Sequence, residues 1–427
     1  MNDDTVFALA SGAGRAAIAI LRISGPDSAK VLIALCGSLP LPRRAVARGL
    51  RDANGDLLDR AMVLWLPGPA SYTGEDSAEL HVHAGRAVID AVAETLVSLG
   101  LRPAEPGEFT RRAFLNGKLD LVSAEAVHDL VAAETEAQRR QALRQLEGAL
   151  GDLYRDWSDR LRGALARQEA LIDFPDEDLP PEVEAELLTS VRALRCEIEA
   201  HLDDRHRGEK IREGLCFAIT GAPNVGKSSL INALAERDVA IVSATPGTTR
   251  DAIETRVVLG GVPVTLVDTA GLRDTNDPIE AEGVRRARSR AGSADLAMTV
   301  IEAGSEFDTD AGGLIVANKS DLYPEQRTTV LAVSALTGAG LPELRARLAA
   351  EAIALTQSSG PPPLTRARHR TSLRAAVRWL VDAEDAVEPE LRGEAMRLAL
   401  RALGTITGQV GVDDILDSIF REFCIGK

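Results

Sequence analysis

The sequence predicts a multidomain chain that combines α/β and all-α parts, and two observations carry this prediction. Between residues 213 and 350, strand-like and helical stretches alternate with glycine-rich turns, the pattern of a doubly wound parallel sheet. In both flanks, 119–212 and 351–427, apolar residues recur at three- and four-residue spacing, which predicts amphipathic helices. The simplest arrangement joins the two flanks into one helical bundle, with the α/β unit inserted between them.

An N-terminal α/β domain is expected over residues 1–118. AAIAILRIS predicts a strand and DSAKVLIALCG a helix. A β-hairpin follows, because Asn54-Gly55 is a strong tight-turn signal between two strand-like runs. AELHVHAG then alternates like a strand, and RAVIDAVAETLVSLG has helical periodicity. His81 and His83 share one face of the expected strand without an evident third ligand, so we interpret them as structural.

The first helical flank is expected to hold one or two long amphipathic helices over about fifty residues from Ser123. Three prolines between residues 175 and 181 interrupt the pattern, and residues 190–207 look helical again. A linker with three consecutive prolines at 361–363 precedes the last helical stretch, because proline cannot continue a helix.

Composition restricts the function classes. The chain has 427 residues, a net charge of −15 and a pI of about 5.0, so a broad non-specific grip on nucleic acid is not expected. It begins with acids rather than a secretory signal, and no apolar run approaches the length of a membrane span. The four cysteines are scattered without a C-x-x-C pair, which favours a reducing compartment. We therefore expect a cytoplasmic protein.

A P-loop is the strongest chemical signal. LCFAITGAPNVGKSSLINAL places Gly221, Gly226, Lys227 and Ser228 at P-loop spacing between a strand and a helix. Backbone N–H groups at the helix N-terminus favour phosphate, Lys227 can reach the terminal phosphates for catalysis, and the Ser228 hydroxyl can bind Mg²⁺. The predicted phosphate-binding residues are Asn224, Val225, Gly226, Lys227, Ser228 and Ser229.

Two further motifs surround the expected phosphate site. VTLVDTAG ends in Asp268, Thr269, Ala270 and Gly271, where the carboxylate suits the Mg²⁺ environment and the Gly271 N–H can meet a terminal phosphate. In PGTTRD, Thr248 and Thr249 are candidates to close over the γ-phosphate and Mg²⁺, with Thr249 as a second Mg²⁺ ligand beside Ser228. Arg250 is either a cation that acts in catalysis or a charge of the switch loop.

The base specificity is predicted by two motifs near the end of the α/β unit. NKSD places Asn318, Lys319 and Asp321 after a strand, and one carboxylate there can accept both guanine N–H donors. In AVSALTG, the Ser334-Ala335 turn can place a backbone N–H on the guanine oxygen. The four motifs occur in order, so the sequence predicts GTP.

Together these and other stretches resemble the MnmE (TrmE) family of tRNA-modifying GTPases over the whole chain. The stretches that carry the resemblance are GAPNVGKSSLINAL, PGTTRD, DTAGLRD, NKSD, DFPDEDLP, RISGPDS, SYTGEDSAEL, EFTRRAFLNGKLDLVSAEAV and the ending CIGK. The resemblance implies a folate-binding, dimerising α/β domain over 1–118, a helical domain from 119–212 and 351–427, and a GTPase domain over 213–350. It also implies a homodimer.

The resemblance further implies the reaction. With an FAD-containing partner, MnmG (GidA), such proteins add an aminomethyl-type group to carbon 5 of the wobble uridine of certain tRNAs, using a tetrahydrofolate derivative. The alternative is a GTPase of ribosome assembly that uses GTP as a timer. That alternative predicts an added RNA-binding module with a basic face, which the sequence does not contain.

Catalysis is expected to depend on a cation. Leu272 occupies the position where small signalling GTPases have a glutamine that orients water. The resemblance implies that the GTPase domains dimerise across K⁺, and that Glu280 positions the water indirectly. The positions that match the K⁺ ligands are Asn224, Ser243, Thr245 and Thr248. Ser243 and Pro246 vary this loop, and SEFDTDAG at 305–312 is shorter than in the family, so a helix there is expected to be reduced or lost.

The resemblance implies a site for 5-formyl-tetrahydrofolate formed by Arg22, Glu79, Lys118 and Lys427. A glutamate can bind the amino-pyrimidine edge of a pterin, and cations suit the folate carboxylates. Without the resemblance, each of these four residues would be interpreted as a surface charge.

The ending FREFCIGK leaves the role of Cys424 open. A prenylation box fits poorly, because Gly426 is not aliphatic and Lys427 is an unfavourable last residue. One alternative is a docked terminus, with Ile415, Leu416, Ile419 and Phe420 forming the apolar face of a helix. The other, which the resemblance favours, is a thiol with a chemical role in the one-carbon step or in tRNA modification.

RARHR, residues 366–370, is a basic cluster directly after the proline linker. It is either a solvated face or a contact for tRNA phosphates.

Overall fold

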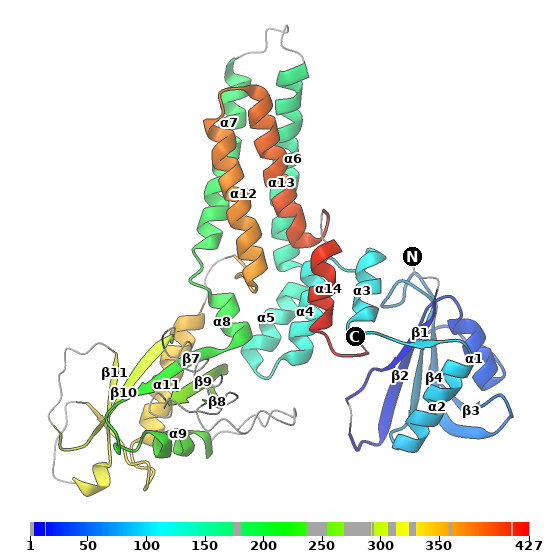
Figure 1. The fold of residues 1–427 in the computed structure, drawn as a ribbon, viewed down its shortest axis with the longest axis horizontal. Coiled ribbons are helices and arrows are strands. Elements are labelled where there is room, and N and C mark those ends of the chain that lie inside the picture. The colour runs from blue at the N-terminus through cyan, green and yellow to red at the C-terminus, as the bar shows by residue number, and fades with distance from the viewer. Residues whose placement is uncertain are drawn as a thin grey trace, which may run out of the picture. The chain divides into compact units, whose positions relative to one another are not determined.

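The computed structural model describes residues 4–12, 14–173, 181–236, 254–268, 292, 294–305, 313–323, 330–357, 361–410 and 413–426. It divides into two compact units, each composed of separate segments of the chain (Figure 1). Unit 1 contains residues 1–128, 151–162 and 397–427, and unit 2 contains residues 129–150 and 163–396. The expected combination of α/β and all-α parts is confirmed, whereas the four-segment division drawn from the sequence stays a prediction.

Unit 1 contains a six-stranded sheet in the order β3-β4-β5-β2-β1-β6. Its strands are β1 (Val6–Leu9), β2 (Ile18–Ser24), β3 (Val46–Arg51), β4 (Leu57–Leu66), β5 (Ser77–His83) and β6 (Arg102–Pro103). All neighbours pair antiparallel except β1 and β6. The hairpin expected at Asn54-Gly55 is confirmed, because β3 and β4 pair on either side of this turn.

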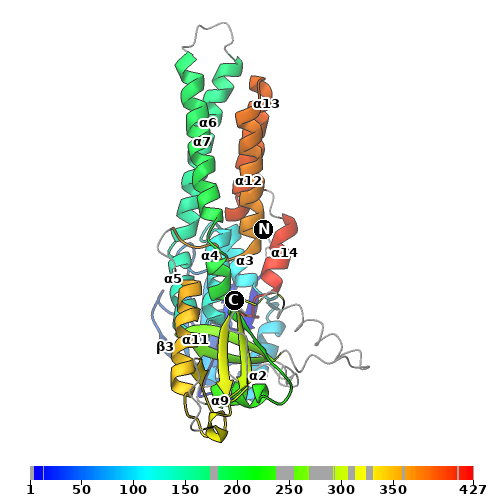
Figure 2. The ribbon, with the colours of Figure 1, turned by 90° about the vertical axis from the view of Figure 1, so that its left-hand side faces the viewer.

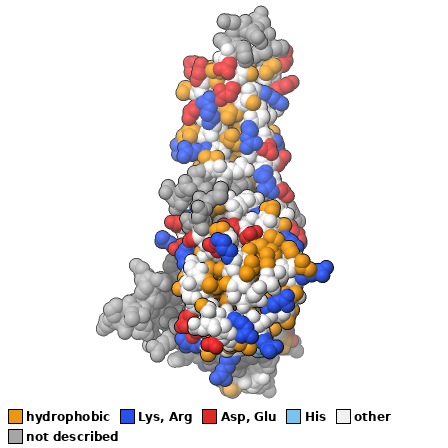
Figure 3. All heavy atoms as spheres, turned by 90° about the vertical axis from the view of Figure 1, so that its right-hand side faces the viewer, with side chains coloured by type: hydrophobic (Ala, Val, Ile, Leu, Met, Phe, Trp, Pro, Cys, Tyr) orange, Lys and Arg blue, Asp and Glu red, His pale blue; other side chains and the backbone are white. Residues whose placement is uncertain are grey.

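The two faces of this sheet differ. Alternating apolar residues of the strands, such as Leu21 and Leu80, form a buried core with helices α1 (Ser28–Cys36) and α2 (Arg86–Ser98). On the other face, Phe109 of α3 (Glu108–Leu115) packs near β1. Farther along that face the side chain of Met62 is 41% exposed. Figure 3 shows one face of the molecule on which exposed hydrophobic side chains gather into a patch.

The C-terminal segment packs within unit 1. Helix α14 (Asp413–Arg421) buries Leu416, Ile419 and Phe420 against α4 (Leu121–Ala132), so these three residues form the apolar face expected from the sequence. The fourth expected residue, Ile415, lies outside the residues whose side chains are described. The docked helix agrees with the first alternative for this terminus, although the Cys424 side chain that follows is exposed.

Unit 2 contains a second six-stranded sheet in the order β12-β11-β10-β7-β9-β8. Its strands are β7 (Leu215–Thr220), β8 (Glu254–Leu259), β9 (Val262–Asp268), β10 (Leu296–Glu302), β11 (Leu314–Asn318) and β12 (Leu331–Ala332). Helices α9 (Lys227–Glu236) and α11 (Leu341–Thr356) pack against it. Every pair is parallel except β8 with β9, which confirms the doubly wound sheet.

Helices from both flanks of this sheet meet in unit 2. Helix α7 (Pro181–Leu202) and helix α12 (Ala367–Asp385) lie side by side in both ribbon views (Figures 1 and 2). Glu384 of α12 accepts hydrogen bonds from Arg192 and Arg195 of α7. Helices α6 (Ala149–Asp173) and α13 (Pro389–Thr407) contribute to both units. Among the described residues, no helix has the length and apolar content needed to cross a membrane.

The expectation of one or two long helices from Ser123 is wrong, because α4, α5 (Glu136–Leu146) and α6 occupy this stretch. Thr135 and Gln138 form a capping box that begins α5, and Gly148 has a φ of 98° after its end. The T-x-x-Q pattern was visible in the sequence. Continuous apolar periodicity hid the interruption, because helices that pack on one core keep the same spacing across a break. Helix α7 also begins earlier than the expected 190.

Both interpretations of the basic cluster RARHR are wrong for two of its arginines. Arg366 forms an ion pair with Asp129 at 2.7 Å, and Arg370 forms one with Asp204 at 2.7 Å. Arg370 is 4% exposed and His369 is fully buried, at 0%. Carboxylates distant in sequence therefore neutralise the cluster inside unit 2, so these two arginines form no solvated face and offer no phosphate contact.

Candidate functional site

The P-loop connects β7 to α9 and depends on a backbone that only glycine adopts easily. Gly226 has a φ of 90°, and a Cβ at this position would lie 2.4 Å from Asn318 Nδ2. Asn224, in the middle of the loop, has a φ of 66° and an exposed side chain. Ser229, in the first turn of α9, is also exposed. The loop therefore places backbone N–H groups at the start of a helix, where anions are favoured.

Lys227 is held by the loop itself. Its ammonium group donates hydrogen bonds to the carbonyls of Gly221 and Ala222, each at 2.8 Å. The residue is only 5% exposed. These two bonds hold the ammonium group at the loop without a carboxylate partner. Lys227 can therefore exchange the two carbonyls for phosphate oxygens without leaving a carboxylate unpaired.

The structure brings together two oxygen groups that suit Mg²⁺. Ser228 Oγ, in the first turn of α9, donates to Asp268 Oδ2, at the end of β9, at 2.6 Å. Strand β9 pairs in parallel with β7, the strand that precedes the P-loop. A hydroxyl and a carboxylate are both ligands that a hard divalent cation prefers, so these residues fit the ion. Asp268 is 4% exposed at the carboxyl end of its strand, the edge at which ligands bind in open α/β sheets.

The residues expected at the guanine form one hydrogen-bonded group. Asn318 Nδ2 donates to the Val225 carbonyl at 2.9 Å, and Asn318 Oδ1 accepts from Ala335 N–H at 3.1 Å. Ser334 Oγ donates to Asp321 Oδ1. Asn318 thus connects the P-loop to the turn at residues 334–335.

Sequence reasoning missed two residues that hold this group. Glu302 ends β10 opposite Asn318, and its carboxylate accepts from Lys319 Nζ at 3.0 Å and from Tyr323 Oη at 3.2 Å. Lys319 has a φ of 64°, so the strand ends abruptly here. The position of Glu302 at the carboxyl end of a strand was the available signal.

Unit 1 places Arg22 and Glu79 directly opposite each other on β2 and β5. They form an ion pair at 3.0 Å, with about one fifth of each side chain exposed. The Arg22 guanidinium also lies 5.5 Å from the Tyr72 ring centre and 5.7 Å from that of Phe109, within range of cation–π attraction. The sequence reasoning missed both aromatic residues, which come from separate segments.

Histidine adds to this arrangement. His81 Nε2 lies 3.2 Å from Glu79 Oε2. Burial alone would raise the pKa of Glu79, but the hydrogen bond from His81 and the charge of Arg22 outweigh it and lower that pKa. Glu79 is therefore held as a carboxylate. Among the described residues no cluster of three or more metal-binding side chains occurs. The structural interpretation of His81 and His83 stays a prediction.

The other expected folate residues are placed as follows. Lys118 Nζ donates to the carbonyl of Pro69 at 3.0 Å. The C-terminal tail reaches β1: Gly426 has a φ of 97°, and a Cβ there would lie 2.3 Å from the Leu9 carbonyl. The Cys424 carbonyl accepts from the Gly107 N–H at 3.4 Å. Since β1 pairs with β2, the tail ends on the strand next to the one that carries Arg22.

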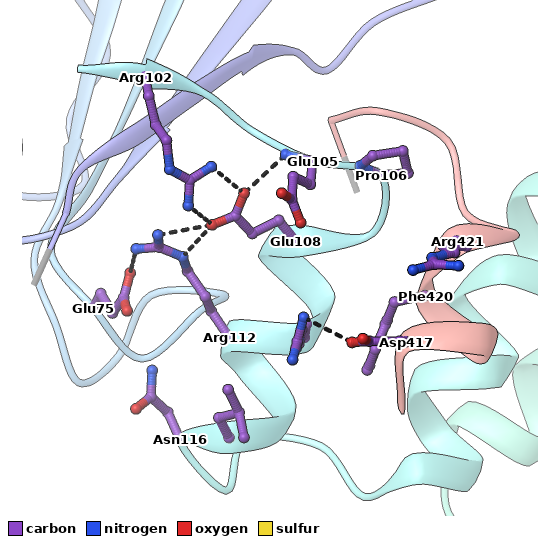
Figure 4. Close-up of a pocket in the computed structure, with 12 residues that line it drawn as sticks. Glu75, Arg102, Glu105, Pro106, Glu108, Arg112, Asn116, Asp417, Phe420 and Arg421 are labelled. Carbon is purple, nitrogen blue, oxygen red and sulfur yellow. Dashed lines mark hydrogen bonds and ion pairs between the residues drawn. The ribbon is translucent and has the colours of Figure 1, made fainter. Parts of the chain in front are cut away.

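A cavity of about 770 Å³ lies between α3 and α14 (Figure 4). Three of the charged side chains that line it are paired. Glu108 lies between Arg102 and Arg112, and its carboxylate is 2.6 Å from the guanidinium of Arg102 and 2.9 Å from that of Arg112. Burial alone would raise the pKa of Glu108, but the hydrogen bonds from Arg102, from the Glu105 N–H and from Arg112 lower it. Arg112 also contacts Glu75 at 3.1 Å. The arrangement holds α3 to its neighbours and leaves these charges compensated.

Several expected site residues lie outside the described part of the chain. They are Ser243, Thr245, Thr248, Thr249, Arg250, Thr269, Ala270, Gly271, Glu280 and Lys427. The same holds for most of the short stretch at 305–312 where a helix was expected to be reduced or lost. The roles assigned to these residues stay predictions.

Two family models match the chain. Residues 5–118 match the model described as GTP-binding protein TrmE N-terminus, and residues 121–424 match the model described as MnmE helical domain. The tRNA modification GTPase MnmE of Gluconacetobacter diazotrophicus is 60% identical over 428 residues, covering 99% of this chain and 98% of that protein. The tRNA modification GTPase MnmE of Granulibacter bethesdensis is 56% identical over 440 residues, covering both chains fully.

One solved structure aligns with about a third of the chain. The FeoB G-domain from Methanococcus jannaschii aligns with 32% of this chain and 97% of its own, at 24% identity and a TM-score of 0.24. This score is too low to support any functional statement.

Proposed function

We propose that this chain, which belongs to the tRNA modification GTPase MnmE family and is a GTPase, takes part in modifying carbon 5 of the wobble uridine of certain tRNAs. The single observation that supports the GTPase most directly is the Ser228–Asp268 hydrogen bond at 2.6 Å beside Lys227. This geometry gathers one cation and two oxygen ligands at the start of α9, where a nucleotide triphosphate and its metal need them.

The residues divide the work on GTP. Lys227 exchanges its two carbonyl partners for oxygens of the terminal phosphates and offsets the negative charge that develops there. Ser228 and Asp268 would hold Mg²⁺, which, when bound, spreads positive charge over the β- and γ-phosphates. Asp321 accepts the guanine N–H donors, and the Ala335 region supplies an N–H to the guanine oxygen. Asn318 connects the P-loop, through Val225, to the turn that carries Ala335.

Hydrolysis is proposed to be stimulated by K⁺ when two GTPase domains associate. The proposed ligands are Asn224, Ser243, Thr245 and Thr248, with Glu280 positioning the water. Asn224, which is the one of these residues within the described part of the chain, has a φ of 66° and an exposed side chain, so a cation can reach it. A cation there would stabilise charge between the phosphates, as an arginine finger does.

Unit 1 is proposed to bind a tetrahydrofolate derivative. Glu79, held as a carboxylate by Arg22 and His81, fits the amino-pyrimidine edge of a pterin, which presents adjacent N–H donors. Tyr72 and Phe109 offer aromatic faces beside it. Lys118 and Lys427 would contact the folate carboxylates, and Cys424, whose exposed side chain follows α14, would act in the one-carbon step or the tRNA modification.

The proposal also names the assembly. The chain would form a homodimer through its N-terminal domain and act in the cytoplasm with the FAD-containing partner MnmG and tRNA. The partly exposed outer face of the sheet, which includes Ile18 at 59% exposure, supports the dimer.

The folate part of the proposal is tested by calorimetry with 5-formyl-tetrahydrofolate. The wild-type protein should bind it, and Glu79→Gln should lose most of the affinity because an amide presents the wrong donors to the pterin. Glu94→Gln, at an exposed position on α2, is the matched control. Equal affinity in Glu79→Gln and in wild type, or no binding by the wild-type protein, would contradict the folate assignment while leaving the GTPase assignment intact.

A further inference from the structure

A second cavity, of about 540 Å³, lies within unit 2 between its sheet and its helical segments. Its walls come from one face of α5, the start of α6, α8 (Arg207–Glu213), the β8–β9 turn, the end of α11 and the proline linker. The volume falls within the range of roughly 300–1,000 Å³ that is usual for small-molecule sites. Neither the nucleotide site nor the proposed folate site uses these residues.

Two polar atoms in the walls are buried and have no hydrogen-bond partner within the described part of the chain. One is the hydroxyl oxygen of Thr365, a residue that is 1% exposed. The other is Oε1 of Gln141. Buried polar atoms in native proteins are normally satisfied by protein, water or a ligand. Two such atoms in the walls of one cavity are therefore candidate contacts for a polar group.

The orientation of the Gln141 amide is determined by its surroundings. Its Nε2 group donates to the carbonyl of Gly208 at 2.9 Å. A carbonyl only accepts, so the NH₂ group must face it and Oε1 is left without a partner. The walls consequently contain an acceptor that requires an N–H or O–H donor, together with the Thr365 hydroxyl, which can donate or accept. Both atoms are covered by their neighbours, so a ligand that bonds to them must move those neighbours aside.

The charge at the cavity is positive. Arg140 and Arg144 lie one helical turn apart on α5 and both line it. Arg140 is paired with Glu136 at 2.6 Å, whereas Arg144 is exposed and has no ion-pair partner among the residues that the structure describes. Arg144 is therefore available for an anionic group, and the neighbouring Arg140 strengthens the local positive potential.

The remaining walls are apolar. They are formed by the side chains of Ala137, Leu150, Ile211, Val262, Ile353, Pro362 and Pro363. Such walls favour an apolar body, and the polar groups then set its orientation. In the cavity of unit 1, by contrast, Arg102 and Arg112 are already bonded to Glu108.

We propose that this cavity binds a small amphipathic anion. Such a ligand has an aromatic or aliphatic body for the apolar walls, an N–H or O–H donor for Gln141 Oε1, and an anionic end for Arg144. Once bound, it would bridge the β8–β9 turn and the end of α11 to α5 and to the linker.

The experiment uses 8-anilinonaphthalene-1-sulfonate, which combines aromatic rings, one N–H and a sulfonate. Fluorescence titration of the full chain should show one saturable site. Gln141→Leu and Arg144→Ala should each weaken that site at least about tenfold, since each removes a charge-assisted or buried polar contact. Arg139→Ala, which changes an arginine of the same helix that does not line the cavity, should leave it unchanged.

Hydrogen–deuterium exchange with and without the dye gives a second readout. Protection should appear in 137–150 and 353–365. Arg144 is exposed, so its substitution does not disturb the core and stays decisive even if Gln141→Leu folds poorly. Saturable binding that neither variant weakens, protection confined to other segments, or no saturable binding at all would overturn the proposal and leave a cavity filled by water.

Discussion

Lys227, in the P-loop of unit 2, and the Arg22–Glu79 pair of unit 1 are held in different ways. Lys227 is bonded to two backbone carbonyls. Arg22 and Glu79 are instead bonded to each other. A charge held by the backbone can be removed without leaving an opposite charge unpaired, whereas a charge held by its partner cannot. Function and stability should thus separate at Lys227 and remain linked at Arg22 and Glu79.

The largest expected effect tests this separation. Lys227→Ala should lower GTP hydrolysis by roughly 10³-fold or more, because a positive charge is lost where phosphate charge develops. Its thermal unfolding should change little, since the released partners are carbonyls at the loop. Phosphate release and calorimetric melting measure the two properties, with exposed Lys30→Ala as the control. Hydrolysis within tenfold of wild type would contradict the assigned role.

The next effect concerns base recognition, and the stability of the protein should again change little. Asp321→Asn should weaken GTP by about a hundredfold relative to xanthosine triphosphate, because the amide presents an N–H donor to a guanine N–H that needs an acceptor. The extra carbonyl of xanthine pairs with the new amide. Competition binding with the two nucleotides measures the ratio. A ratio equal to that of the wild-type protein would remove the guanine assignment of Asp321.

A pH effect of intermediate size should distinguish the two units. Burial lowers the pKa of His201, in unit 2, from 6.5 to about 4. Between pH 6.5 and about 4, the unfolded chain binds a proton at this histidine and the folded chain does not. The free energy of unfolding therefore falls by about 1.4 kcal/mol for each pH unit of acidification across this range. Glu79, in unit 1, has a lowered pKa, so its contribution is lost only at more acidic pH, as pH falls below its ordinary 4.5.

Urea denaturation near pH 7 and near pH 5 measures this pH effect. His201→Gln should lose much less stability on acidification than the wild-type protein does. His83→Gln, at an exposed position, should behave like wild type. The same acid sensitivity in His201→Gln as in wild type would assign the effect to other groups.

The smallest effect tests the linkage in unit 1. Arg22→Met and Glu79→Gln should each lower the free energy of unfolding, and the double variant should lose less than the sum, with a coupling of about 1 kcal/mol. The pair is one-fifth exposed, so water screens part of its attraction. A double-mutant cycle in urea gives the coupling directly. Additive losses would mean that the two charges are held independently of each other, as Lys227 is held by backbone carbonyls.

The same difference explains how far the sequence could predict each site. The P-loop and the guanine group depend on backbone geometry and short spacings, so Lys227, Ser228 and Asn318 were identifiable from adjacent residues. Arg22 and Glu79 are brought together by strand register, 57 residues apart, and only a family resemblance pointed to them. Tyr72 and Phe109 gave no local signal, because their proximity to Arg22 arises from packing.

The fold shows a similar limit. Strand–helix alternation and the Asn54-Gly55 turn predicted both sheets correctly, since those signals are local. The basic cluster at 366–370 was misinterpreted because its carboxylate partners, Asp129 and Asp204, lie more than 150 residues away. Local charge says nothing about a distant counter-ion. The capping box at Thr135 was readable, but it was concealed by periodicity that continued across the helix boundary.

The closure of the C-terminal segment on the first strands has a consequence for synthesis. Phe114 and Leu121 belong to the early part of unit 1, and the residues that cover them, Leu416 and Phe420, belong to its last part. About 270 residues separate these two segments of unit 1. At about 5–20 residues per second, the ribosome needs roughly 15 to 55 seconds to supply the missing helix. During that interval the nascent chain presents an uncovered apolar surface, on which a chaperone would act.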